Sequence, residues 1–415
     1  MMQRFDIAIV GAGPAGATAA RFLAASGHEV VMLEQDKGPR DKPCGGGLRP
    51  GVLLRIPHLK ALAGRFVECA TTEAVLSAPG APFVSYKVPA GEHPMMFQTR
   101  RSVFDRVLVD DAMSKGATLE EGARVRNAAG GEKGWKLRLE DGREVRARGV
   151  IAAGGASCPV AKRMRVAGGA AKCFPRERLA VSWAREFVVG ERFIEEAYGE
   201  ARTAHIVMRF ADVTGYAWVF PKREHVNIGF GALINDLRGI DGLEVSQGFA
   251  KHLAGRGLLP SHPDGGRWQA APIPMGGPSG PVVRPGAVAI GDAAGFVSPL
   301  AGDGLYYAVE SGRMAAEVMH RGLEKGDMTP EFLVAYSKAW KKAWGKELEV
   351  LWKVAHRISK DPVTVLKLAA TDPKIPPLVL KLFQGEGDLG RTAVALYGRS
   401  ALATLRMPSK GDWEC

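Results

Sequence analysis

The stretch Phe5-Asp6-Ile7-Ala8-Ile9-Val10-Gly11-Ala12-Gly13-Pro14-Ala15-Gly16 decides the fold of this chain. Residues 5–10 form a short, continuous and largely aliphatic run, which is typical of a buried parallel strand. The alanine-rich residues 15–25 predict a helix, which Gly27 ends, and residues 29–33 predict a second strand. The sequence therefore predicts a complete βαβ unit within about 30 residues.

The spacing Gly11-x-Gly13-x-x-Gly16 is the fingerprint of a dinucleotide-binding turn. Gly11 allows the tight turn, Gly13 lets the backbone approach a pyrophosphate, and Gly16 permits close packing of helix against strand. The pyrophosphate would meet the free N–H groups and the positive dipole end of the helix. The cofactor-binding residues predicted in this turn are Gly11, Gly13, Pro14, Ala15 and Gly16.

Glu34 ends the second strand and is placed to accept hydrogen bonds from ribose hydroxyls. An acid at this position argues against a 2′-phosphate, so the turn predicts FAD or NAD rather than NADP. An ordinary glycine-rich turn is the alternative, and the complete βαβ context with its acid disfavours it.

A second segment, residues 287–295, predicts the other half of a flavin site. A buried strand runs into a turn that contains Gly291 and Asp292, and Asp292 would hold ribityl hydroxyls. Residues 305–323 predict a long helix, whose N-terminus near Gly302 and Gly304 would face the flavin pyrimidine. The helix dipole would then stabilise negative charge on the N1–C2=O edge of a reduced flavin.

Composition limits the partners of the chain. The 415 residues carry a net charge of +12, which suits an anionic partner such as a nucleotide or lipid headgroups. The sequence has no basic run of five residues and no zinc-finger spacing, so we expect no nucleic acid. It also has no uncharged apolar stretch of about 18 residues, so we expect no spanning helix. The odd, scattered set of cysteines favours a reducing, cytoplasmic location; these are Cys44, Cys69, Cys158, Cys173 and Cys415.

Tyr216, Trp218 and Phe220 alternate along a predicted strand and would share one face of it. Such a stripe is typical of core packing. Phe220-Pro221 at the strand end and the following Asn227-Ile228-Gly229 favour the alternative, a wall that faces the flavin or a substrate.

The region after residue 329 is mostly helical and basic. One alternative is a helix that packs its apolar face on the body of the protein, and the other is a membrane-surface helix with Trp at the interface. Histidines are isolated and show no ligand spacing, so we predict no metal. The residues at helical spacing in this region are Trp340, Trp344, Leu348, Leu351, Trp352 and Ala355.

Three segments resemble the geranylgeranyl reductase family, within the flavoproteins that share the p-hydroxybenzoate hydroxylase fold. They are Lys42-Pro43-Cys44-Gly45-Gly46-Gly47-Leu48, Tyr216-x-Trp218-x-Phe220-Pro221 with Asn227-Ile228-Gly229-x-Gly231, and Gly291-Asp292-Ala293-Ala294-Gly295 through Gly302-Asp303-Gly304. The resemblance covers about residues 5–330.

The resemblance implies an FAD-dependent reductase that saturates double bonds of a geranylgeranyl-type chain on a lipid, quinone or pigment precursor by hydride transfer. It places Cys44, Gly45 and Gly46 beside the isoalloxazine, Arg101 at the cofactor and Val125 at the adenine. A monooxygenase acting on an apolar small molecule is the alternative within the same fold. With Cys44, the aromatic residues Tyr216, Trp218 and Phe220 are the candidate catalytic residues.

One departure from the hydroxylase pattern concerns the electron donor. Gly154 stands where hydroxylases of this fold carry an acid that touches FAD and nicotinamide, and there is no second GxGxxG for a nicotinamide domain. The donor, NAD(P)H or reduced ferredoxin, is therefore left open. Because the implied substrate lives in bilayers and the chain is basic, we expect peripheral association with a membrane surface.

The expected architecture is α/β. A parallel Rossmann-type FAD-binding sheet comprises residues 1–70, 95–160 and 282–330. An antiparallel substrate and catalytic sheet domain comprises residues 71–94 and 161–281, and a helical C-terminal part comprises residues 331–415. Residues 179–230 are expected to be mainly strand, and residues 268–285 a Pro/Gly-rich loop.

Overall fold

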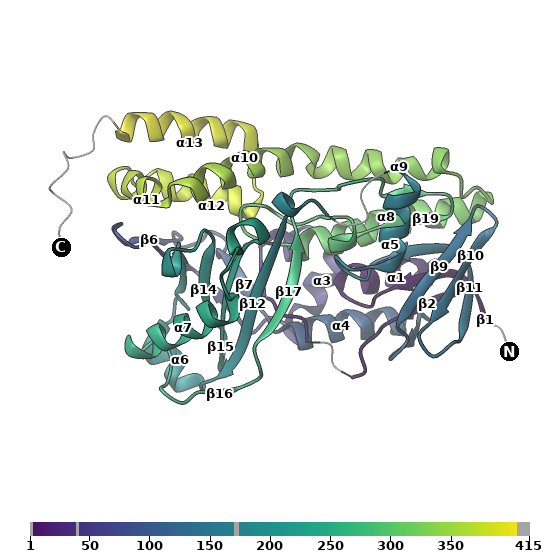
Figure 1. Ribbon diagram of the computed structural model, residues 1–415, viewed down its shortest axis with the longest axis horizontal. Helices are drawn as coiled ribbons and strands as arrows, with labels where there is room; N and C mark the ends of the chain where they lie inside the picture. Colours follow the sequence, from purple (N-terminus) through teal and green to yellow (C-terminus); the bar gives the residue numbers. More distant parts are fainter. Residues whose placement is uncertain (1–2, 39–40, 170–173, 405–415) are drawn as a thin grey trace. The chain divides into compact units, whose positions relative to one another are not determined.

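The chain folds into two units, each assembled from three separate stretches of sequence (Figure 1). The computed structural model describes residues 3–38, 41–169 and 174–404, so Cys173 and Cys415 lie outside it. The first unit comprises Met1–Asp41, Arg101–Leu179 and Ile273–Leu348, and the second comprises Lys42–Arg100, Ala180–Pro272 and Glu349–Cys415. Residues 42–70 and 95–100 thus belong to the second unit, whereas the nucleotide-binding turn belongs to the first.

The first unit is built on a mainly parallel sheet with the strand order β18-β19-β11-β1-β2-β8. Parallel pairing joins β1 to both β2 and β11, β2 to β8, and β11 to β19. An antiparallel hairpin, β9–β10, extends from β11. The strands are β1 (Gln3–Val10), β2 (Val30–Leu33), β8 (Thr118–Glu120), β9 (Val125–Gly131), β10 (Gly134–Leu139), β11 (Glu144–Ala152), β18 (Val283–Arg284) and β19 (Ala287–Ala289).

Helix α1 (Pro14–Ala25) packs between α4 (Arg101–Ser114) and α8 (Leu305–Lys325) in this unit. Most of its residues are buried, which explains the run of alanines and glycines, since only small side chains let neighbouring backbones approach closely. Pro14 occupies the first turn, where its missing N–H costs nothing, and Gly27 follows the helix with φ of +83°. The βαβ unit expected from the sequence is confirmed.

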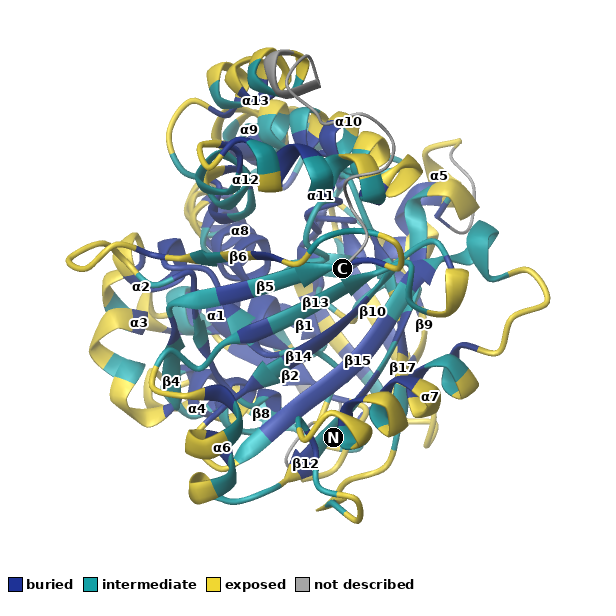
Figure 2. Ribbon diagram, turned by 90° about the vertical axis from the view of Figure 1, so that its left-hand side faces the viewer, coloured by how far each residue is buried: buried dark blue, intermediate teal, exposed yellow. Residues whose placement is uncertain are grey.

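The second unit contains a seven-strand path, β16-β12-β15-β14-β13-β5-β6, with β17 paired to β12. Along the seven-strand path the pairings are antiparallel except for β13 with β5, which run parallel. Strand β15 is buried over most of its length, whereas α6 and α7 expose one side (Figure 2). The elements are β5 (Glu73–Ser77), β6 (Val84–Lys87), β12 (Leu179–Val188), α6 (Glu191–Tyr198), β13 (Ala204–Met208), β14 (Tyr216–Pro221), β15 (His225–Leu233), α7 (Gly242–Gly255), β16 (Asp264–Gly265) and β17 (Gln269–Pro274).

A small three-stranded sheet, β3-β7-β4, also belongs to this unit. It joins β3 (Gly47–Leu48), β7 (Met96–Gln98) and β4 (Cys69–Thr71) in antiparallel pairs. Because β3 directly follows the Cys44-Gly45-Gly46 segment, this sheet fixes where that segment ends.

One local expectation was wrong, and one helix was missed. The region 179–230 is mainly strand, as expected, but it also contains α6, which Gly190 and Gly199 bracket. The region 268–285 was expected to be a loop, but it contains β17 and β18. Prolines in β17 are tolerated because the strand has only one pairing partner, β12, among the described residues.

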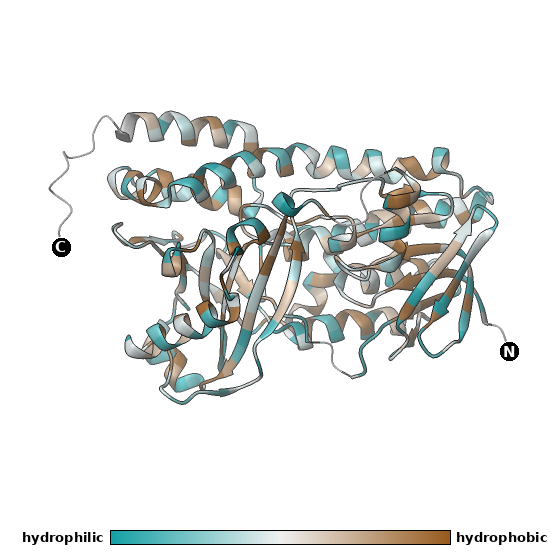
Figure 3. Cartoon of the chain, viewed as in Figure 1, coloured by the Kyte–Doolittle hydropathy of each residue, from teal (hydrophilic) through white to brown (hydrophobic). Residues whose placement is uncertain are grey.

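Helices occupy the chain from residue 330 to 404, as expected. Helix α10 carries hydrophilic and hydrophobic residues along its length (Figure 3), and no helix in the described ranges is long and apolar enough to span a bilayer. The helices are α9 (Pro330–Trp340), a π-helical turn (Lys341–Gly345), α10 (Lys346–Lys360), α11 (Pro362–Thr371), α12 (Ile375–Gln384) and α13 (Leu389–Thr404).

Candidate flavin and substrate site

Two positions in the turn between β1 and α1, Gly11 and Gly16, have no room for a side chain. Gly11 has φ of +102°, and a Cβ there would lie 2.6 Å from the Ala153 carbonyl oxygen. A Cβ on Gly16 would lie 2.0 Å from the Gly11 carbonyl oxygen. Among the described residues no side chain caps the N-terminus of α1, where Gly13 is the N-cap. The bare N–H groups at this helix start fit a bound pyrophosphate.

Glu34 is buried and aimed at the same turn. Its Oε2 accepts a hydrogen bond of 2.9 Å from the Ala12 N–H, and its Oε1 accepts one of 3.2 Å from the Asp36 N–H. The Ala123 N–H donates to the Glu34 carbonyl oxygen at 2.7 Å, which brings the start of β9, including buried Val125, alongside the end of β2. The predicted ribose and adenine positions therefore adjoin one another in the first unit.

The Gly291 turn contacts the fingerprint helix. A Cβ on Gly291 would lie 3.0 Å from the Ala15 Cβ, and the Gly291 N–H donates to Ser311 Oγ at 3.0 Å. A Cβ on Gly304 would lie 3.1 Å from Asp292 Oδ1, which places that carboxylate at the start of α8. Gly302 has φ of +64° just before the helix. The two predicted halves of the cofactor site thus meet within one unit, and the residues present fit FAD.

Arg101 lies in the first turn of α4 with its side chain buried. Its guanidinium donates two hydrogen bonds of 2.7 Å to the Asp105 carboxylate, one helical turn along the chain. This bidentate pair satisfies and orients a cation that is almost fully removed from water. Contact between Arg101 and the cofactor stays a prediction.

The Cys44-Gly45-Gly46 segment packs tightly within the second unit. Gly46 has φ of +79°, and a Cβ there would lie 1.9 Å from the Thr99 carbonyl oxygen, so a larger residue is excluded. A Cβ on Gly45 would lie 2.6 Å from the Phe220 ring. The Gly46 N–H faces Cys44 Sγ at 3.4 Å. The structure therefore brings this segment against the aromatic strand, two features that are about 175 residues apart in sequence.

The aromatic stripe consists of Tyr216, Trp218 and Phe220 on β14. The Trp218 ring centroid lies 5.8 Å from that of Tyr216 and 6.4 Å from that of Phe220. Trp218 is 6% exposed, and a Cβ on Gly229 would lie 2.1 Å from its ring, so the indole lies against the backbone of β15. Tyr216 and Phe220 are half-buried. The stripe is thus partly packed and partly accessible.

A buried polar network supports the aromatic stripe. Trp218 Nε1 donates to Asn227 Oδ1 at 2.8 Å, and Asn227 Nδ2 donates to Glu186 Oε2 at 2.9 Å. The ammonium of Lys222, which is fully buried, donates to Glu186 Oε1 at 2.8 Å and to the Gly45 carbonyl oxygen at 3.2 Å. One chain of hydrogen bonds therefore links the indole of the stripe to the glycine segment.

We expect Lys222→Met to lower the free energy of unfolding by about 3 kcal/mol, because it leaves the Glu186 carboxylate without its cation. This is the low end of the range for a broken buried pair, since Glu186 is 25% exposed. Urea unfolding measures the change. The exposed pair Lys136–Glu144 provides the matched control. Lys136→Met should lower the free energy of unfolding by less than about 1 kcal/mol.

The double variant Lys222→Met/Glu186→Gln should recover part of the loss, because it no longer buries an unpaired charge. Equal losses for Lys222→Met and Lys136→Met would contradict a structural role for the network.

A second thiol lies close to this network. Cys69 Sγ faces the Pro221 carbonyl oxygen at 3.6 Å, and burial raises the pKa of the thiol to about 11. Cys69 therefore stays protonated at neutral pH and is a poor nucleophile.

Comparison with known proteins agrees with this geometry. Residues 4–226 match the family described as FAD binding domain. The menaquinone reductase of Mycobacterium tuberculosis is 32% identical over 351 residues, which cover 76% of each chain. Digeranylgeranylglycerophospholipid reductase 1 of Methanopyrus kandleri is 31% identical over 372 residues, which cover 86% of this chain and 91% of that one. The chain belongs to the geranylgeranyl reductase family of FAD-dependent oxidoreductases.

The fold of this geranylgeranyl reductase family member also matches a solved structure. A geranylgeranyl bacteriochlorophyll reductase-like protein from Thermoplasma acidophilum superposes with a TM-score of 0.76 at 24% identity, covering 89% of this chain and 92% of that one. The expected α/β architecture and FAD as cofactor are confirmed.

Of the two alternatives for the C-terminal tryptophans, the structure favours packing on the body of the protein for Trp340 and Trp344. Trp340 and Trp344 are buried, with ring centroids 5.1 and 5.6 Å from that of Phe296. Both indoles therefore belong to the packed interior of the first unit, which leaves them unable to sit at a lipid interface.

Sequence reasoning missed the roles of Lys222, Glu186 and Asn227. Lys222 follows a Phe-Pro pair and resembles an exposed turn lysine, and Glu186 lies 36 residues away on β12. Only the pairing of β12, β15 and β14 brings them together, and no short motif encodes that pairing.

Proposed function

We propose that this protein saturates isolated double bonds in the prenyl chain of a lipid, quinone or pigment precursor. The observation that carries the proposal is the aromatic stripe packed on the Cys44-Gly45-Gly46 segment, in a chain related to reductases named for menaquinone and digeranylgeranylglycerophospholipid. An apolar aromatic face suits a hydrocarbon chain, which offers no group for hydrogen bonding.

In this proposal, Gly11, Gly13 and Gly16 hold the pyrophosphate of FAD, Glu34 a ribose, and Asp292 the ribityl chain. Reduced FAD supplies a hydride. The dipole at the start of α8 near Gly304 would stabilise negative charge on the pyrimidine end of the reduced flavin. All of these groups belong to the first unit.

The residues of the second unit act on the substrate. An isolated alkene has no carbonyl to accept charge, so a proton must arrive nearly in step with the hydride, and positive character builds on the tertiary carbon. The ring faces of Tyr216, Trp218 and Phe220 would exclude water and stabilise the positive charge on that carbon. Cys44 and Tyr216 are the side chains of this surface that carry an acidic proton, and an ordered water is the alternative donor.

The test is mass spectrometry of prenylated lipid and quinone extracts incubated without oxygen with dithionite-reduced protein. We expect products heavier than their precursors by about two mass units per reduced bond. A monooxygenase would need O₂ and would add oxygen instead. Dithionite reduces the flavin directly, so the result does not depend on whether NAD(P)H or reduced ferredoxin is the physiological electron donor. Extracts that remain unchanged would refute the proposal.

We also propose that the protein binds membrane surfaces peripherally, supported by its net charge of +12 and by the lipid character of the proposed substrate. Liposome co-sedimentation should rise with the fraction of anionic lipid and fall between about 50 and 500 mM salt, because salt screens surface charge. Protein that stays in the supernatant at every lipid composition would contradict this proposal.

A further inference from the structure

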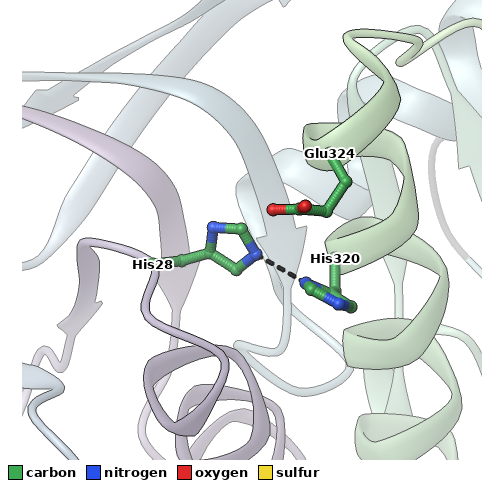
Figure 4. Close-up of side chains that lie close together, drawn as sticks. All are labelled: His28, His320 and Glu324. Atoms are coloured by element: carbon green, nitrogen blue, oxygen red, sulfur yellow. Dashed lines mark hydrogen bonds between the residues drawn. The ribbon is translucent and has the colours of Figure 1, made fainter.

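A cluster of metal-ligating side chains lies in the first unit, away from the cofactor turn. His28 Nε2 and His320 Nδ1 face one another at 2.8 Å, and the Glu324 carboxylate completes a group whose ligand atoms all lie within 4.8 Å of each other (Figure 4). His28 comes from the turn between α1 and β2, whereas His320 and Glu324 lie one turn apart on α8. The three side chains therefore converge from two elements that α1–α8 packing holds together.

We propose that His28, His320 and Glu324 bind a divalent transition-metal ion of the zinc type, which fastens the α1–β2 turn to the C-terminal end of α8. Two imidazoles and one carboxylate form a donor set that zinc takes in proteins, with water filling the remaining tetrahedral position. Glu324 is exposed, so that position is open to solvent.

Holding zinc requires the side chains of the cluster to rearrange. Ligand atoms about 2.0–2.1 Å from a tetrahedral zinc ion are roughly 3.3 Å apart, so the two rings must separate by about 0.5 Å and turn toward the ion, and the ligand atoms that now lie up to 4.8 Å apart must converge. His320 and Glu324 are four residues apart on one helix and therefore project from the same face.

The charges around the cluster favour a cation on balance. Asp6 Oδ2 lies 3.9 Å from His28 Nδ1, the ring nitrogen that faces away from His320, which is too far for a hydrogen bond but puts a negative charge beside the ring. The C-terminal end of α8 adds partial negative charge. Arg148 is the opposing cation, but its guanidinium already pairs with Asp6 at 3.1 Å and with the Leu323 carbonyl oxygen at 3.2 Å.

The position of the cluster indicates a structural role. His28 precedes β2 at the N-terminal edge of the parallel strands, whereas the fingerprint turn follows the carboxyl end of β1. His320 lies 16 residues along α8 from Gly304, about 24 Å at the helical rise. A metal here stabilises the unit without touching the reacting atoms.

Isothermal titration calorimetry of the FAD-loaded, EDTA-treated protein with Zn²⁺ tests the proposal. We expect about one ion per chain at pH 7.5 and a melting temperature raised by roughly 5 °C at a hundredfold excess over Kd. His28→Gln/His320→Gln should weaken binding at least about 100-fold. His262→Gln, a change at an exposed histidine outside the cluster, should leave it unaltered.

If the double variant does not fold, Glu324→Gln replaces it, because Glu324 is exposed and its loss should weaken binding at least about tenfold without unfolding the chain. Affinity that is unchanged in Glu324→Gln or in the double variant, or no binding by the wild type, would overturn the proposal and leave an ordinary hydrogen bond between two histidines.

Discussion

Gly13→Val should prevent FAD binding and reduce the FAD content from about one molecule per chain to less than about 0.1. Gly13 has φ of −69°, which any residue adopts, so valine does not strain the backbone. Its side chain would instead occupy the space where the pyrophosphate approaches the start of α1. Flavin absorbance after denaturation, divided by protein concentration, measures the content.

Gly248→Val is the matched control. Gly248 is an exposed glycine of α7 with open space around it, so the same chemical change there should keep full FAD content. Far-UV circular dichroism of both variants should match the wild type. A folded Gly13→Val protein that still carries FAD would refute the assignment of the fingerprint turn.

Trp218→Ala should slow reoxidation of the reduced flavin by a geranylgeranyl substrate about 100-fold in anaerobic single turnover. The substitution removes the central ring of the aromatic stripe and its hydrogen bond to Asn227, so the prenyl chain loses its fixed position. Misplacing reacting atoms by about 1 Å is enough for a loss of this size. FAD content should hardly change, because the stripe and the pyrophosphate turn belong to different units.

Two further variants separate substrate positioning from packing. Trp218→Phe keeps an aromatic face but loses the bond to Asn227, so it should retain most of the rate. Trp183→Ala removes a tryptophan of β12 that packs against Gly242 of α7, so it should lower stability and leave the rate unaltered. Wild-type rates and products in Trp218→Ala would mean that the stripe is only core packing.

The parts of the fold that could be predicted are those encoded within a few residues. The Gly11 turn, the alternation of Tyr216, Trp218 and Phe220, and the strand before Gly291 each follow from a spacing that dictates a backbone geometry or a shared face. Helix α6 was missed because its eight residues lie between strands and carry weak end signals. Strand β17 was missed because its prolines are compatible with a strand only at an edge.

The polar and metal-ligating groups could not be predicted in the same way. Lys222 pairs with Glu186 across 36 residues, and His28 meets His320 across 292. Each pair depends on which strands and helices become neighbours, and the spacing rules used for ligand motifs contain no such information. The expectation that no metal binds rested on those rules alone.

The alternation of the chain between its two units constrains how the protein is made. Its six segments change unit five times, and β19, which pairs with residues 150–152 of β11, is synthesised about 135 residues after the end of β11. At about 5–20 residues per second, the ribosome needs about 7–27 s to cover that interval. Throughout this time the end of β11 presents an unpaired edge, the kind of surface that recruits other strands and leads to aggregation. Because each unit is assembled from three separate stretches, neither can be expressed by truncating the chain, and this edge can close only after β19 has been made.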